Sequence, residues 1–156
     1  MFDECITRRC AYAVMEYLKL RDPPIEGVFL LDFVGKQGSL DDEWSSLLTP
    51  PEDWIVITAD AGKTGPKIHA KGPPLHLILP NKRIRAFFLS GKRLTQISGQ
   101  ERAIAIISRM PDMLAAARQS PEHMRYKVIR RHNAIVVEPW PLTPSPDART
   151  PRPNQP

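Results

Sequence analysis

Cysteine and long apolar runs are both scarce in this chain of 156 residues. The two cysteines, Cys5 and Cys10, lie on different sides of one predicted helix, so we expect reduced thiols and a cytoplasmic protein. The longest apolar runs, at residues 27–31 and 75–79, are far shorter than the roughly 20 residues of a membrane-spanning helix. We expect no secretory leader either, because the chain opens on acids and then Arg8-Arg9. We therefore expect no membrane partner.

Acidic residues are missing from the middle of the chain, whose formal net charge is +5. Residues 61–100 contain no Asp or Glu, but they carry the basic residues Lys63, Lys67, Lys71, Lys82, Arg83, Arg85, Lys92 and Arg93. The segment before them is acidic, with Asp32, Asp41, Asp42, Glu43, Glu52 and Asp53. An acidic centre with a basic rim suits a phosphodiester substrate, which the rim attracts through its phosphates. The alternative is a solvated basic face without a ligand.

The domain organisation follows from composition. A hydrophobic content of 42% is enough for one domain with a core of its own, which we assign to residues 1–140. Proline then dominates residues 141–156, which we expect to be a disordered tail, because proline supports neither helix nor sheet hydrogen bonding.

The hydrophobic pattern predicts alternating helices and strands. We expect helices at residues 6–20, 42–48 and 100–118, with a kink or division at Pro111, and strands at 27–31, 54–58, 75–79, 125–129 and 134–137. The run 85–89 is compatible with either type. This alternation is typical of an α/β fold around a mainly parallel sheet.

Three acidic positions attract attention because one of them directly follows a buried strand. The strand at 54–58 ends in Thr58-Ala59-Asp60, and ligands of open α/β sheets bind beyond the carboxyl ends of such strands. Asp3 follows the first two residues, and Asp41 opens the helix at 42–48. Three carboxylates that converge repel one another and favour a divalent cation such as Mg²⁺. The alternative is that Asp3 and Asp41 only cap helices.

A phosphate-binding loop is not supported, although Gly62-Lys63-Thr64 follows a strand. The motif needs a glycine five residues before Gly62, and Ile57 occupies that position. Carboxylate and metal chemistry is therefore the better supported enzymatic option.

These motifs together resemble the PIN-like domain family, and in particular the PIN-like proteins grouped with VapC-type toxins of toxin–antitoxin pairs. The resemblance rests on Phe2-Asp3-Glu4, on the run from Leu40 to Trp44, and on the run from Ile55 to Asp60. It implies a three-layer α/β/α sandwich with a mainly parallel central sheet and a metal-dependent ribonuclease that cleaves single-stranded RNA. Asp3, Asp41 and Asp60 match the catalytic acids that bind Mg²⁺ or Mn²⁺, with Thr58, Asp42 and Glu43 as supporting residues.

The resemblance also implies partners. Single-stranded RNA would contact the basic residues Lys63, Lys67, Lys82, Arg83 and Arg85. An antitoxin protein and a homodimer stay open as further partners. The competing hypothesis is a non-catalytic PIN-like module that binds RNA or a protein.

The chain departs from the family pattern at its first strand. Only Met1-Phe2 precede Asp3, where the family has several residues, so either the start lies upstream or the first strand is short. A fourth acid beyond Asp60 is also missing.

Overall fold

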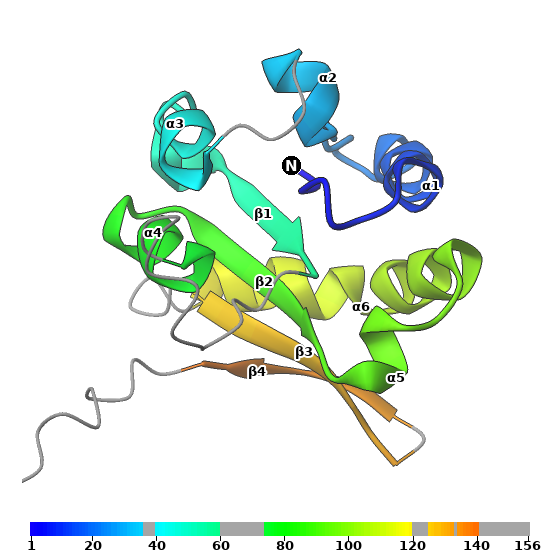
Figure 1. The fold of residues 1–156 in the computed structure, drawn as a ribbon. Coiled ribbons are helices and arrows are strands. Elements are labelled where there is room, and N and C mark those ends of the chain that lie inside the picture. Colours follow the sequence, from blue (N-terminus) through cyan, green and yellow to red (C-terminus); the bar gives the residue numbers. More distant parts are fainter. Residues whose placement is uncertain (36–39, 60–73, 120–124, 133, 141–156) are drawn as a thin grey trace, which may run out of the picture.

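The computed structural model describes residues 1–35, 40–59, 74–119, 125–132 and 134–140 (Figure 1). The proposed tail at 141–156 lies outside these residues. Within them, no helix combines the length and the apolar character needed to cross a membrane.

A four-stranded sheet forms the centre of a mixed α/β fold, as expected. Its strands lie in the order β1 (Ile55–Thr58), β2 (Arg85–Ser90), β3 (Arg125–Arg131) and β4 (Ala134–Pro139). The pairs β1–β2 and β2–β3 are parallel, and only β3–β4 is antiparallel. The run that the sequence left open at 85–89 is therefore a strand at the middle of the sheet.

The first three residues extend this sheet beyond β1. Phe2 forms parallel bridges to Ile57 on one side and to Phe29 on the other. Its N–H donates to the carbonyl of Val28 at 2.8 Å, and its carbonyl accepts from the N–H of Leu30 at 2.8 Å. In Figure 1 the amino terminus accordingly lies beside β1. Residues 1–3 are thus a short interior strand flanked by two chain segments.

The helices surround the sheet in chain order. They are α1 (Arg8–Lys19), α2 (Leu30–Val34), α3 (Asp41–Ser45), the 3₁₀ turn η1 (Pro51–Asp53), α4 (Leu75–Asn81), α5 (Lys92–Thr95) and α6 (Gly99–Gln119).

Two apolar clusters cover opposite faces of the sheet. Ile57 and Phe87 point into the cluster made with α1 and α6, which pack against each other. Their neighbours Val56 and Phe88 point into the cluster made with α3 and α4. This alternation follows from the two-residue period of a strand, and it explains why the central strands are apolar on both faces.

The predicted strand at 75–79 is wrong, because this segment is α4. Its buried residues are Leu75, Ile78 and Leu79, which is the spacing of one helix face. Leu77, which a strand would place beside Leu75 and Leu79, is 36% exposed instead. Pro74 precedes the helix and Pro80 lies near its end. A five-residue apolar run between prolines does not distinguish the two periods, so the packing of α4 on β2 decided the outcome.

Two further expectations need correction. The strand expected at 27–31 is reduced to the bridge at Phe29, because Leu30 already begins α2. Pro111 lies inside α6 without dividing it, since the helix is continuous from Gly99 to Gln119. The helices expected at 6–20 and 42–48 are present, and they begin at Arg8 and Asp41.

Alanine substitutions in α4 distinguish the helix from the strand. Leu79→Ala is expected to lower the free energy of unfolding by about 2–5 kcal/mol, because a fully buried side chain leaves a cavity. Leu77→Ala should cost less than about 1 kcal/mol, because its side chain already reaches solvent. Urea unfolding of both variants measures the difference. Equal losses would place both side chains on one face, as in a strand.

Candidate functional site

Asp3 is a buried carboxylate at the end of the first strand. Only 4% of its surface is exposed. Its Oδ1 accepts the N–H of Glu4 at 2.7 Å, and its Oδ2 accepts the hydroxyl of Thr58 at 2.6 Å. Thr58 is itself fully buried at the end of β1. The structure therefore joins two of the predicted site residues, which lie 55 positions apart in the chain, by a direct hydrogen bond.

Asp3 does not cap the following helix. The N-cap residue of α1 is Thr7, and the Asp3 carboxylate bonds to Thr58 and Glu4 instead. The capping alternative for this residue is therefore wrong, and its burial needs another explanation.

The surroundings raise the pKa of the Asp3 carboxyl above its ordinary value. Burial is the main cause, and the negative charge of Glu4 adds to it. The hydrogen bonds from Thr58, from the Glu4 amide and from the Cys5 thiol lower the pKa but do not outweigh burial. Among the interactions that set this pKa in the described chain, none comes from Lys or Arg. The carboxylate is thus held by dipoles and not by a cation.

The position of this pair in the sheet is the one where open α/β sheets bind ligands. In space the segments lie in the order 28–30, 1–3, β1 and β2, so the chain turns to one side after residue 3 and to the other after β1. The carboxyl ends of two neighbouring parallel strands leave a crevice at such a switch point. Asp3 and Thr58 stand at these two ends, and Asp60 follows two residues later, outside the described residues.

The acids of α3 have partners of their own. Asp41 Oδ1 accepts the indole N–H of the buried Trp44 at 3.2 Å, which holds this side chain along the helix. Glu43 accepts the backbone N–H of Leu40 at 3.4 Å. Each contact lies within one helical turn. They stabilise the start of α3, where carboxylates also complement the helix dipole.

Lys82 connects α3 to the turn after α4. Its Nζ lies 2.7 Å from Asp42 Oδ1, and it donates to the Asp42 carbonyl at 2.8 Å and to Ser46 Oγ at 2.6 Å. The side chain is only 26% exposed. The residue predicted to bind RNA is therefore engaged in a tertiary contact at the amino end of β2.

The other predicted RNA-binding residues are spread over the chain. Arg83 adopts a left-handed backbone conformation with φ of 62°, and Arg85 begins β2. Both lie at the amino end of that strand, whereas Asp3 and Thr58 lie at carboxyl ends. Lys63 and Lys67 lie outside the described residues.

A complete metal site is not present in the described part of the chain, where no three His, Cys, Asp or Glu residues form a group able to hold an ion. Asp60 is outside this part. The convergence of Asp3, Asp41 and Asp60 therefore stays a prediction.

Sequence reasoning missed Cys5 as a neighbour of the site. Its thiol contributes a hydrogen bond to Asp3, which lies two residues earlier in the chain. The spacing alone carried no signal, because the turn at residues 4–5 is what directs the side chain back.

The raised pKa of Asp3 predicts a pH-dependent stability difference. An acid whose pKa is higher in the folded state contributes stability below its ordinary pKa, and this contribution is lost as the pH rises through the folded value. As the pH rises from about 4 to 7, the free energy of unfolding of the parent should therefore fall relative to that of Asp3→Asn. Urea unfolding of both chains without divalent cations measures the difference.

The Met1 amine does not disturb this comparison. Burial lowers its pKa to about 5, but it titrates in the parent and in the variant alike. A stability difference that stays constant over the pH range would show that the Asp3 pKa is not raised by folding.

Loss of the Lys82 contacts is expected to weaken the fold. Lys82→Met should lower the free energy of unfolding by about 1 kcal/mol, because it leaves the Asp42 carbonyl and Ser46 without their charged partner. Lys19→Met is the matched control, since the exposed pair of Lys19 with Glu16 contributes about 0.5 kcal/mol or less. Urea unfolding compares the two, and equal losses would contradict a structural role for Lys82.

Comparison with protein-family models, with curated proteins and with solved structures gives no match to this chain. Its function is therefore argued from the site itself.

Proposed function

We propose that the chain is a PIN-like domain, a three-layer α/β/α sandwich, that acts as a metal-dependent ribonuclease on single-stranded RNA. The observation that carries this proposal is the buried Asp3 carboxylate at a switch point of the sheet, bonded to Thr58 and without Lys or Arg among the described groups that set its pKa. Burial of a charge without compensation is costly, and a bound cation would offset this cost.

The donor atoms fit Mg²⁺ or Mn²⁺. Both ions prefer oxygen ligands, and carboxylates of Asp3, Asp41 and Asp60 would hold the ion. When bound, the ion supplies the positive charge that activates water for attack on phosphorus and stabilises the leaving oxygen.

The chain's own residues have separate roles in this proposal. Thr58 fixes Asp3 Oδ2 through its 2.6 Å hydrogen bond, so that Oδ1 and Oδ2 keep a defined orientation. Asp60 stands two residues beyond Thr58, so β1 directs it to the same edge. Asp42 and Glu43 support the start of α3, from which Asp41 would reach the ion.

RNA would approach over the basic segment. Lys63, Lys67, Arg83 and Arg85 would contact phosphates without selecting a sequence, while Lys82 keeps α3 in place. An antitoxin protein that covers this edge is the partner that a toxin role implies.

A second function is favoured by the contacts within α3. Asp41, Asp42 and Glu43 each have a structural partner, as helix-start acids do. A non-catalytic module that binds RNA or a protein needs nothing more from them. The two functions differ in their requirement for a metal.

Calorimetric titration with Mn²⁺ tests the proposal. We expect the parent to bind the ion, and Asp3→Asn and Asp60→Asn to weaken binding at least about tenfold, because each removes one carboxylate ligand. Asp112→Asn is the matched control, because Asp112 pairs with Arg109 on the surface of α6. Circular dichroism verifies that every variant is folded.

Cleavage of a labelled single-stranded RNA follows with the same four chains. Activity that needs Mn²⁺ and is lost in Asp3→Asn and Asp60→Asn supports the ribonuclease. RNA binding that persists in EDTA, without Mn²⁺ binding or cleavage, would replace the ribonuclease with the non-catalytic module.

A further inference from the structure

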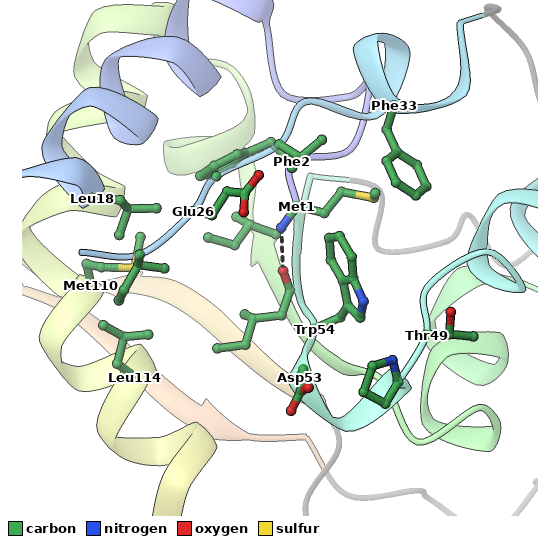
Figure 2. Close-up of a pocket in the computed structure, with 16 residues that line it drawn as sticks. Met1, Phe2, Leu18, Glu26, Phe33, Thr49, Asp53, Trp54, Met110 and Leu114 are labelled. Carbon is green, nitrogen blue, oxygen red and sulfur yellow. Dashed lines mark hydrogen bonds between the residues drawn. The ribbon is translucent and has the colours of Figure 1, made fainter. Parts of the chain in front are cut away.

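A cavity of about 590 Å³ lies at the amino ends of the first strand and β1, away from Asp3 (Figure 2). Leu18 of α1 and Met110 and Leu114 of α6 line one side of it, and Phe33 and Trp54 line another. Figure 2 also shows the amine of Met1 at this cavity, where it donates to the Ile55 carbonyl at 2.7 Å. Its size is within the usual range of ligand sites, and its lining is mostly apolar.

The cavity continues the path of the first strand. Met1 and Phe2 lie between residues 28–30 and β1, hydrogen-bonded to both. Both flanking segments reach past Met1, since residues 25–28 and 53–55 also line the cavity. The space ahead of Met1 is thus bounded on two sides by backbone, at the separation that one strand occupies. We call it the strand slot.

A backbone donor faces the strand slot. The Val28 carbonyl accepts the N–H of Phe2. The N–H of the same residue points to the same side in an extended segment. Within the described residues, this N–H makes no hydrogen bond. An added strand would supply the missing acceptor.

The side chains around the strand slot define the chemistry of its occupant. Phe2 points to the cluster of α1 and α6, and Met1 points to the opposite cluster. Two residues ahead of Met1 in the same register would alternate in the same way, one toward Leu114 and the next toward Trp54. Both positions are apolar.

The charge at the strand slot is negative although the chain is basic. Glu26 and Asp53 line it, and no Lys, Arg or His is among its lining residues in the described part of the chain. An occupant with basic residues beyond its two apolar residues complements these carboxylates.

We propose that the strand slot binds an extended segment of a partner protein as an added parallel strand, with two apolar residues next to Met1 and basic residues ahead of them. The backbone of residues 25–28 and 53–55 provides affinity, and the two apolar positions with Glu26 and Asp53 provide selectivity, as in other cases of strand addition. This site is independent of the ribonuclease proposal, because it lies at the amino ends of the strands.

The probe is the peptide acetyl-Lys-Lys-Ile-Leu-amide, titrated into the full chain with amide chemical shifts as the readout. We expect shifts centred on Val28 and Trp54. The Glu-Glu-Ile-Leu peptide should bind at least about tenfold more weakly, because its charge repels Glu26 and Asp53. A peptide N-methylated at leucine should bind more weakly as well, because it cannot complete the strand pairing.

Matched variants of the protein test the location. Leu114→Trp fills the strand slot and should weaken binding of the Lys-Lys-Ile-Leu peptide at least about tenfold, whereas Ile104→Trp, at an exposed position of the same helix, should leave it unchanged. In Glu26→Gln with Asp53→Asn, the preference for Lys over Glu should disappear.

Two results would overturn the proposal. One is no peptide binding by the folded parent at millimolar concentration, or binding that is insensitive to N-methylation and to Leu114→Trp. The other is stabilisation only when the same four residues are attached ahead of Met1, which would assign the strand slot to one continuous chain and not to a partner.

Discussion

The insertion of residues 1–3 between β1 and residues 28–30 is the constraint on which the rest of this structure depends. Four backbone hydrogen bonds join Phe2 and Asp3 to Val28, Leu30 and Ile57. Since Phe2 is almost fully buried in the cluster of α1 and α6, the same short strand also links the sheet to its helical layer. Without it, β1 would be an edge strand and Asp3 would have no fixed position.

This insertion gives the two ends of the first strand opposite characters. At the carboxyl end, Asp3 is buried against Thr58, and its negative charge is compensated only by hydrogen-bond donors among the described residues. At the amino end, the strand stops inside an apolar cavity whose charged groups are acidic. The first end suits a cation and its phosphodiester substrate, and the second suits a basic peptide. Both properties follow from one strand because it is interior and short.

The helices α3 and α4 show how a charge distribution in sequence differs from one in space. The acidic run before residue 60 and the basic run after it predicted an acidic centre with a basic rim. Lys82 and Asp42 instead neutralise each other at 2.7 Å and hold the two segments together. Part of the basic rim is therefore structural. Arg83 and Arg85 stay at the amino end of β2, so the site at the carboxyl ends draws its cations from elsewhere.

Sequence alone determined the mixed α/β class, the interior strands at 55–58 and 85–90 as apolar runs, and the long helices α1 and α6, because each of these has a clear period or composition. It also singled out Asp3 and Thr58, since polar residues at the ends of apolar strands are conspicuous. Tertiary structure decided that residues 75–81 are a helix, because the run is too short to show its period and its packing on β2 selects one face. It also decided that Asp3 and Thr58 meet and that a slot remains ahead of Met1. Contacts across 55 positions depend on strand order, which no local pattern of residues encodes.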